Sequence, residues 1–515
     1  MVSGNPQLPM TRLIVSIFCR DSEQIRRDVS RAIESGADMI ELRVDTYNDV
    51  IDIILLFEQV DYTFILTRRP KRQGGESTEA EGDRLMMLSS FRAERDNKVW
   101  VDLEMDADRD EDFRDLENDK SIISQHDFEG RPPTLGKIYV EMCKEKSAVA
   151  KLAWTARTVR DCVECFQLLD VRAKPTIAVC MGEAGQVSRI LAKKFGAFAG
   201  FASLDAASAT APGQVSIDDL KNLYRWDAIN KNTRVYGVVG SPVGHSMSPA
   251  IHNAAFEQLR FDGVYVPLLV NPGYESFKAF METFLDFKPL HLSGLSITIP
   301  HKENALRYAL EKGWAIDPLA GKIGAVNTFV INEQPRAFSS DYSAILDTIT
   351  VALSINLREL NGMRVSVLGA GGTGRTAVAG LTHQGAAVSV FNRTRDKADL
   401  LAKEFGATAY DMGDLGNVPC DVLINTTSVG MSPHEGESPV PDDFAFAGKP
   451  LVFDTIYNPA RTKLTEQAAA AGCSTVGGIE MFVRQAAKQF EAWTTQPAPT
   501  ELMRQVVEQK LARKI

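Results

Sequence analysis

The chain has 515 residues, and its 57 basic and 67 acidic side chains give a formal net charge of −10. At roughly 100–200 residues per domain, this length predicts two or three domains. The hydrophobic (44%) and charged (24%) fractions are those of globular proteins and exclude a fibrous or disordered chain. The acidic balance argues against nucleic acid as a partner. No apolar run reaches the roughly 18 residues that a membrane span needs.

Two features of the sequence bear on the cellular compartment. The first residues, MVSGNPQLPMTRLIVSIF, have no charged region ahead of their apolar run and no small-residue cleavage site, so we expect a first strand here and neither export nor import. The seven cysteines are odd in number and scattered, which favours a reducing compartment. Cys162 and Cys165 form a single CxxC, which we interpret as one packed face of a helix. We expect a cytoplasmic protein without a metal site, as a monomer or a small homo-oligomer.

Residues 11–205 repeat one pattern, a short β-branched run followed by an amphipathic stretch such as 22–35 or 186–195. Eight such units in about 220 residues predict a (β/α)8 TIM barrel, because doubly wound sheets rarely have so many parallel strands in so short a segment. The expected strands are 13–18, 39–44, 63–68, 99–104, 121–126, 148–154, 176–181 and 197–203.

Lys151 stands out among the ionisable residues at the ends of these strands, because its neighbours in AVAKLAW are all apolar. A charge there is costly unless it is paired or employed. The amine could simply reach water at the strand end. Alternatively, a desolvated amine attacks a ketone and forms an iminium, which acidifies the adjacent C–H and lets a β-hydroxyl leave as water. A histidine such as His126 is the natural proton carrier for both steps.

Six segments of this half, taken together, resemble type I 3-dehydroquinate dehydratase. They are IELRVD (40–45), TRRPKRQGGE (67–76), ISQHDF (123–128), VAKLAWTA (149–156), QVSR (186–189) and ATAPGQ (209–214). The resemblance implies that Lys151 forms the Schiff base, that His126 is the general acid/base and that Arg189 clamps the substrate carboxylate. The other substrate contacts that it implies are Ser16, Glu41, Arg43, Arg69, Thr210 and Gln214. This chain departs from the family at Gln73, where a glutamate usually accompanies the histidine, and at Thr210, where serine is usual.

A second α/β region follows the polar stretch 225–234, and it contains the strand–turn–helix MRVSVLGAGGTGRTAVAGL (363–381). A GxGxxG between a strand and a helix is a dinucleotide fingerprint, in which the helix N-terminus binds the pyrophosphate. The next strand ends in Asn392, Arg393 and Thr394, where an NAD site would have an acidic residue. Arg393 attracts a 2′-phosphate, so we predict NADP, although a solvated loop arginine is the alternative.

The segments between residues 240 and 344 supply further polar side chains. Ser246 and Ser248 bracket one methionine in a turn-rich segment suited to a carboxylate, although such segments are usually plain turns. Lys302 could be an ordinary lysine at a helix start, and Asp341 a capping residue.

These segments and the fingerprint together resemble shikimate dehydrogenase over residues 235–515, including INTTSVGM (424–431), FDTIYNP (453–459) and GGIEMFVRQAAKQFEAW (477–493). The resemblance implies that Lys302 and Asp341 are the catalytic pair. It implies substrate contacts at Ser246, Ser248, Thr298, Asn327, Tyr457 and Gln485. It implies cofactor contacts at Gly369, Gly371, Gly372, Thr373, Gly374, Asn392, Arg393, Thr394, Thr427, Ser428, Gly478 and Met481.

We therefore expect an α/β protein with a barrel in residues 1–229, a substrate-binding lobe in 230–345, a Rossmann domain in 346–476 and C-terminal helices in 477–515 that return to the substrate-binding lobe. The order of the halves resembles the bifunctional fusion of plants. It implies dehydration of 3-dehydroquinate to 3-dehydroshikimate, then NADPH-dependent reduction to shikimate. A quinate-preferring dehydrogenase and a metabolite-sensing regulator are the alternatives. The survival of Lys151, His126, Lys302 and Asp341, without a basic DNA-binding module, favours the enzyme.

Overall fold

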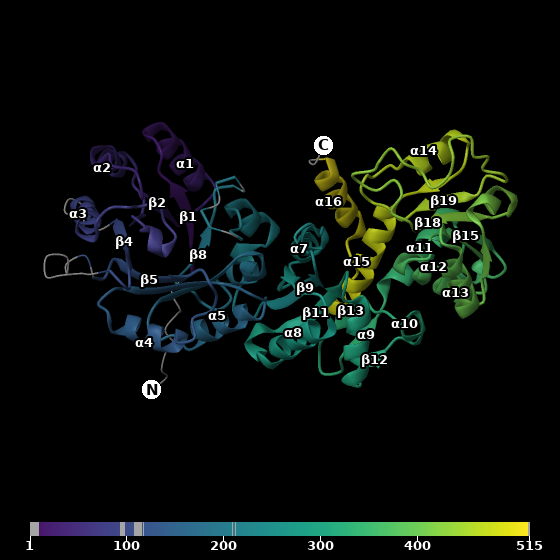
Figure 1. Ribbon diagram of the computed structural model, residues 1–515, viewed down its shortest axis with the longest axis horizontal. Helices are drawn as coiled ribbons and strands as arrows, with labels where there is room; N and C mark the ends of the chain where they lie inside the picture. The colour runs from purple at the N-terminus through teal and green to yellow at the C-terminus, as the bar shows by residue number, and fades with distance from the viewer. Residues whose placement is uncertain are drawn as a thin grey trace. The chain divides into compact units, whose positions relative to one another are not determined.

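The computed structural model describes residues 10–92, 98–107, 116, 118–205, 207–208, 210–211 and 213–512. The chain forms two compact units (Figure 1). The first consists of residues up to His245 with Asp262–Leu292, and the second of Ser246–Phe261 with Ser293 to the C-terminus. Among the described residues, no helix is both long and apolar enough to cross a membrane.

The first unit contains an eight-stranded parallel sheet whose strands neighbour one another in chain order, and β1 also pairs with β8. Phe198, just before β8, donates its main-chain N–H to the carbonyl of Thr176 in β7 (2.8 Å), which brings the two ends of the sheet together. All eight predicted strands are confirmed, and with them the barrel. They are β1 (Arg12–Phe18), β2 (Met39–Arg43), β3 (Phe64–Thr67), β4 (Val99–Glu104), β5 (Ser121–Asp127), β6 (Val149–Thr155), β7 (Thr176–Met181) and β8 (Ala199–Ala202).

The interior of the barrel is layered because side chains two residues apart on a strand face the same way. An apolar cluster fills one layer with Ile14, Met39, Ile65, Ile122, Val149 and Ile177. Two residues further along the same strands stand the polar Ser16, Glu41, Thr67, Ser124 and Lys151, and on β7 the apolar Val179. The sequence therefore places a polar layer on an apolar floor, towards the carboxyl ends of the strands.

Helices follow most of these strands: α1 (Ser22–Glu34), α2 (Val50–Gln59), α3 (Glu81–Arg92), α4 (Leu135–Lys144), α5 (Asp161–Asp170) and α6 (Gln186–Ile190). Asp21 caps α1 by accepting a hydrogen bond from the main-chain N–H of Gln24. Cys162 and Cys165 are both buried on α5, as predicted. The helix predicted over 186–195 is wrong beyond Ile190, where turns follow. The cause is a tertiary contact: Lys194 is buried, and its Nζ donates to the carbonyls of Lys231 and Thr233 (both 2.8 Å).

The first unit continues past the barrel into β9 (Arg234–Gly240), β10 (Gly263–Leu269) and α8 (Tyr274–Asp286), with β9 and β10 parallel. Phe287, at the end of α8, lies against Phe195 and Phe166 of the barrel, with ring centroids 5.7 and 6.4 Å away. This segment thus packs on the barrel within one unit. The domain boundary near residue 230 stays a prediction.

The second unit begins with α7 (Ser248–Gln258) and includes β11 (Leu292–Ile297), which is antiparallel to β13 (Thr328–Val330). β13 is antiparallel to β14 (Arg336–Phe338), which pairs with β12 (Ala315–Ile316). The helices between these strands are α9 (Lys302–Glu311), α10 (Pro318–Ile323) and α11 (Ser340–Leu353). From the C-terminal end of the chain, α15 (Gly478–Thr494) packs on α11 and β13, and α16 (Thr500–Ala512) packs on α7.

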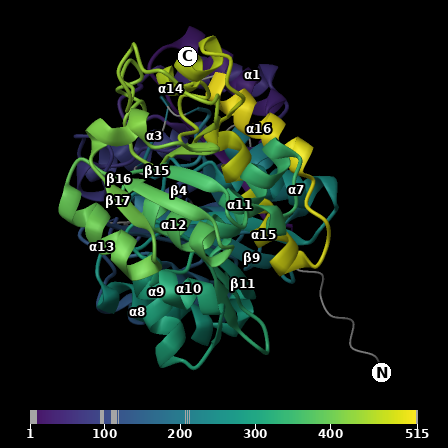
Figure 2. The ribbon, with the colours of Figure 1, turned by 90° about the vertical axis from the view of Figure 1, so that its right-hand side faces the viewer.

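A six-stranded parallel sheet completes the second unit, in the order β17-β16-β15-β18-β19-β20. Figure 2 labels β15, β16 and β17 of this sheet. The strand order is the 3-2-1-4-5-6 order of a Rossmann fold, so the predicted Rossmann fold is confirmed. The strands are β15 (Arg364–Leu368), β16 (Ala387–Phe391), β17 (Thr408–Tyr410), β18 (Val422–Asn425), β19 (Leu451–Asp454) and β20 (Thr475–Val476), and the helices are α12 (Gly372–His383), α13 (Arg395–Phe405) and α14 (Lys463–Ala470).

Candidate active sites

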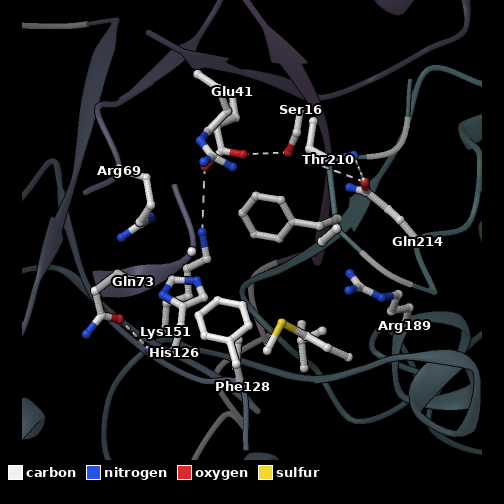
Figure 3. A pocket seen from close by; sticks show the side chains of 17 residues that line it. Ser16, Glu41, Arg69, Gln73, His126, Phe128, Lys151, Arg189, Thr210 and Gln214 are labelled. Carbon is white, nitrogen blue, oxygen red and sulfur yellow. Dashed lines mark hydrogen bonds and ion pairs between the residues drawn. The ribbon is translucent and has the colours of Figure 1, made fainter. Parts of the chain in front are cut away.

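A cavity of about 130 Å³ opens in the polar layer of the barrel (Figure 3). Every residue predicted for this half lines it: Ser16, Glu41, Arg43, Arg69, His126, Lys151, Arg189, Thr210 and Gln214. They come from β1, β2, the end of β3, β5, β6, α6 and the loop after β8. We call this cavity the barrel pocket. The structure therefore brings together residues that are up to 198 positions apart in the chain.

Lys151 lies in the barrel pocket with its amine between carboxylates. Its Nζ donates to Asp102 Oδ2 at 2.7 Å and lies 3.6 Å from Glu41 Oε1, and the ring of Phe201 is 4.3 Å away. The polar contacts of this amine come from β4 and β2 and not from its apolar neighbours in the chain. Lys151 is nevertheless only 7% exposed.

The two carboxylates beside Lys151 are held in their charged form. Burial by itself raises the pKa of Asp102, but Arg69 and Lys151 outweigh it and hold that pKa well below its usual range. For Glu41, burial is likewise opposed by Lys151 and Arg43, so its pKa is lowered. Ser16 donates to Glu41 Oε2 and fixes its orientation.

His126 is the second candidate for proton transfer. Its Nδ1 is buried and has no hydrogen-bond partner among the described residues, and its ring stacks on Phe128 at 6.3 Å. Burial, followed by the charges of Arg69 and Lys151, lowers the pKa of His126 well below 6.5, so the neutral imidazole is favoured at pH 7. Gln73 lies beside this histidine but contacts its main chain: Gln73 Oε1 accepts from the N–H of His126 at 2.9 Å.

Arg189 is a buried cation without an anion. It is 3% exposed, its Nε has no hydrogen-bond partner, and no carboxylate of the described chain pairs with it. Burial lowers its pKa to about 10. Figure 3 shows Arg189 and Gln214 on the side of the pocket opposite Arg69 and Gln73. An uncompensated guanidinium in a cavity is suited to bind the carboxylate of a ligand.

The second candidate site lies around Lys302, the first residue of α9, whose Nζ donates to Asp341 Oδ2 at 2.7 Å. Asn327 lies in an adjoining network, in which its Oδ1 accepts from the N–H of Ser340 (2.8 Å) and its Nδ2 donates to Gln485 Oε1 (3.5 Å). The main-chain N–H of Val326 donates to the carbonyl of Lys302, which ties the two sets together (3.2 Å).

Other residues predicted for this site form no hydrogen bond with Lys302 within the described part of the chain. Ser246 Oγ accepts from the N–H of Ser248 (3.2 Å) where α7 begins, and the ring of Tyr457 stacks on Phe482 at 5.0 Å. Burial raises the pKa of Tyr457. Within the described ranges, no hydrogen bond joins Ser246, Ser248, Thr298 or Tyr457 to Lys302 or Asp341. Their place in one substrate site stays a prediction.

The glycine-rich turn between β15 and α12 has the geometry of a nucleotide loop. Gly369 has φ +106°, and a Cβ on Gly374 would lie 2.2 Å from the carbonyl oxygen of Gly369, so both positions need glycine. Gly371 and Gly372 face open space, with nothing within 4 Å of a Cβ built on them. A pyrophosphate could approach the backbone there, at the N-terminus of α12. Thr373 follows in the first turn of this helix.

The remaining predicted cofactor residues surround this turn. Asn392 Oδ1 accepts from the N–H of Ala370 (3.2 Å), which holds the end of β16 to the turn. Arg393 is exposed and has no ion pair among the described residues. Thr394 and Ser428 are also exposed. The hydroxyl of Thr427 donates to Asn425 Oδ1 (2.7 Å). Gly478 and Met481 are buried at the start of α15.

Two residues of this site were not predicted from the sequence: Phe128, which lines the barrel pocket, and Asp102, which is fully buried against Lys151. Asp102 stands in VWVDLE, where an acidic residue between apolar neighbours gave the same signal that singled out Lys151. Phe128 gave none, because an aromatic residue after a strand is common.

Different protein-family models match the two parts of the chain that contain the two candidate sites. Residues 13–231 match the model of type I 3-dehydroquinase. Residues 238–329 match the shikimate dehydrogenase substrate binding domain, 351–432 match shikimate / quinate 5-dehydrogenase, and 478–508 match the shikimate 5′-dehydrogenase C-terminal domain.

Individual relatives are similar to the whole chain or to its second half. The bifunctional 3-dehydroquinate dehydratase/shikimate dehydrogenase, chloroplastic, of Arabidopsis thaliana is 36% identical over 503 residues, which cover 93% of this chain and 81% of that protein. The shikimate dehydrogenase (NADP(+)) of Methanosarcina acetivorans is 37% identical and covers 53% of this chain and 97% of its own. A solved shikimate 5-dehydrogenase from Thermus thermophilus, in complex with NADP(H) and shikimate, is 31% identical, covers 54% of this chain and 99% of its own, and has a TM-score of 0.47.

Proposed function

The chain belongs to the family of bifunctional 3-dehydroquinate dehydratase/shikimate dehydrogenases, and on this premise we propose that its two halves catalyse consecutive steps. The barrel removes water from 3-dehydroquinate to give 3-dehydroshikimate. The second half reduces that ketone to shikimate with NADPH. The protein is thus both a lyase and an oxidoreductase of the shikimate pathway.

In the barrel pocket, Lys151 attacks the substrate ketone and forms an iminium with loss of water. His126, whose neutral ring is favoured, then takes a proton from the adjacent carbon and returns one to the departing hydroxyl group. Arg189 binds the substrate carboxylate. The observation that carries this assignment is the coincidence, in one cavity, of the Lys151 amine, the His126 Nδ1 and a buried arginine, the last two without a partner among the described residues. Ser16, Glu41, Arg43, Arg69, Thr210 and Gln214 orient the substrate.

In the second half, bound NADPH supplies a hydride to the ketone carbon. Lys302 donates a proton to the ketone oxygen as negative charge develops there, and Asp341 orients Lys302 and supports its charge. Ser246, Ser248, Thr298, Asn327, Tyr457 and Gln485 hold the substrate.

NADP is the cofactor of the dehydrogenase relatives, and the residues of this chain fit it. Gly369, Gly371, Gly372, Thr373 and Gly374 hold the pyrophosphate on the turn before α12. Asn392, Arg393 and Thr394 face the adenosine end, where the unpaired charge of Arg393 favours a 2′-phosphate over a free hydroxyl. Thr427, Ser428, Gly478 and Met481 would complete the cofactor site.

The domain limits that we propose are 1–229, 230–345, 346–476 and 477–515. We also propose a cytoplasmic monomer or small homo-oligomer without nucleic-acid or membrane partners. The seven cysteines, all free, support a reducing compartment, whereas the Arabidopsis relative is named as chloroplastic.

The test is to incubate the protein with 3-dehydroquinate and NADPH and to follow enone absorbance and NADPH oxidation. Lys302→Ala should accumulate the enone without oxidising NADPH, and Lys151→Ala should do neither unless 3-dehydroshikimate is added. Loss of both activities in each variant would contradict the assignment of one lysine to each step.

A further inference from the structure

Asp102, a buried carboxylate on β4, lies in direct contact with the reacting nitrogen of the barrel. We infer that Asp102 is a catalytic residue of the dehydratase, which holds the Lys151 nitrogen in its charged forms before and after the covalent step. The inference rests on the proposed dehydratase function and adds a residue to it.

The geometry leaves Asp102 one orientation. Its Oδ1 lies 2.8 Å from Arg69 Nη2 and accepts from Ser124 Oγ at 2.5 Å, while its Oδ2 accepts from Lys151 Nζ at 2.7 Å. The residue is fully buried, so water does not compete for these contacts. Both oxygens are thus in use, and one of them is aimed at the amine.

Glu41, the other acidic neighbour, is a weaker candidate for this role. Its Oε1 is 3.6 Å from Nζ and already accepts from Thr67 Oγ1 at 2.8 Å, and its Oε2 accepts from Ser16. Glu41 therefore contributes charge, whereas Asp102 contributes charge and a hydrogen bond.

The atom balance of the covalent step explains why this contact matters. An ammonium and a ketone give an iminium and water: a new N–C bond forms, the C–O bond breaks, and two of the three ammonium protons leave with the oxygen. The nitrogen keeps one proton and its positive charge. Asp102 Oδ2 can accept from that remaining N–H as it did from the ammonium, so the pair is preserved on both sides of the step. Only the neutral amine that attacks the ketone lacks this ion pair.

The consequence for catalysis is twofold. Asp102 disfavours the neutral form of the Lys151 amine, so attack on the ketone is restricted at low pH. Asp102 also keeps the iminium protonated, and the adjacent C–H becomes acidic only while the nitrogen carries that positive charge. The other charged or titratable side chains of the pocket are Glu41, Arg43, Arg69, His126 and Arg189. Because Arg69 and Lys151 hold the pKa of Asp102 well below its usual range, Asp102 stays charged across the working pH range.

The experiment compares Asp102→Asn with Asp45→Asn in the full-length protein. Asp45 is a matched control, because it is 1% exposed and paired with an arginine (Arg43, 2.7 Å), but it does not contact Nζ. Borohydride trapping with 3-dehydroquinate is measured by mass spectrometry from pH 5 to 9, together with kcat for dehydration.

For Asp102→Asn we expect the pH of half-maximal adduct formation to fall by about one unit and kcat at the optimum to fall about 100-fold. Asp45→Asn should not move the pH of half-maximal trapping. Ser124→Ala, which removes one hydrogen bond to Asp102, should lower the pH of half-maximal adduct formation by a smaller amount. If Asp102→Asn does not fold, Ser124→Ala provides the test.

An adduct on wild-type Lys151 with unchanged pH dependence and kcat in the variants overturns the role of Asp102 alone. The absence of any wild-type adduct overturns the proposed Schiff-base function, and the inference with it.

Discussion

Gln73 offers the sharpest test of how charge near His126 governs the dehydratase. Its Oε1 accepts the main-chain N–H of His126 at 2.9 Å, and its Nε2 faces Asp106 Oδ2 at 3.5 Å. Gln73→Glu keeps the acceptor but introduces a negative charge at a position that is only 5% exposed. That charge should raise the pKa of His126, which burial, Arg69 and Lys151 hold low.

The size of the effect follows from distance and dielectric. Taking roughly 6 Å between the new carboxylate and the imidazole and an effective dielectric constant of about 20–40, the interaction is about 1.4–2.8 kcal/mol, or about one to two pKa units. Arg72, which pairs with Asp106 at 3.0 Å, limits the repulsion between Asp106 and the new carboxylate. Because the neutral imidazole takes the proton, a higher pKa moves the acidic limb of kcat against pH upward by that amount.

The assay is kcat for dehydration from pH 4.5 to 9, for wild type and Gln73→Glu. Gln214→Glu makes the same chemical change on the opposite side of the pocket, where the amide accepts from Thr210, and should alter KM while leaving the acidic limb in place. Superimposable profiles for wild type and Gln73→Glu would refute the coupling between position 73 and His126.

Three further predictions concern the rest of the chain. Arg393→Ala should weaken NADPH binding by roughly 10- to 150-fold, about 1.5–3 kcal/mol, and leave NADH little changed in titrations; equal losses would mean that Arg393 only supports the loop. Asp341→Asn should lower kcat for reduction while dehydration stays at the wild-type rate, and a parallel loss of both would indicate unfolding. Phe287→Ala should destabilise the first unit by about 1–3 kcal/mol in urea unfolding, because Phe287 packs on Phe166 and Phe195; an unchanged midpoint would show that this packing contributes nothing.

Local signals predicted most of the fold. The eight strands of the barrel and the turn at 369–374 are coded by periodicity and by glycine spacing within a few residues, so the sequence alone sufficed. The helix expected over 186–195 failed because burial of Lys194 against the carbonyls of Lys231 and Thr233 overrides helical propensity. That contact joins residues about 40 positions apart, which no local pattern reports.

The same limit applies to the barrel pocket. The polar residues could be predicted one by one, but their pairing could not. Lys151 meets Asp102, 49 residues away, and Arg69 meets Glu104, 35 residues away, only because the barrel aligns their strands. Sequence reasoning therefore found the amine and missed the carboxylate that balances its charge.

The two proposed catalytic lysines make the same contact with an aspartate, but one forms a covalent bond and the other transfers a proton. Lys151 and Lys302 each donate to an aspartate at 2.7 Å, but the side chain of Lys151 is 9% exposed and that of Lys302 is 37% exposed. An amine that must bond covalently to a ketone benefits from burial, since water would hydrolyse the iminium and hydrate the amine. An ammonium that gives its proton to an alkoxide must regain one each turnover, and exposure lets solvent supply it. The surroundings of each lysine–aspartate pair, and not the pair itself, thus set which lysine forms a bond and which transfers a proton.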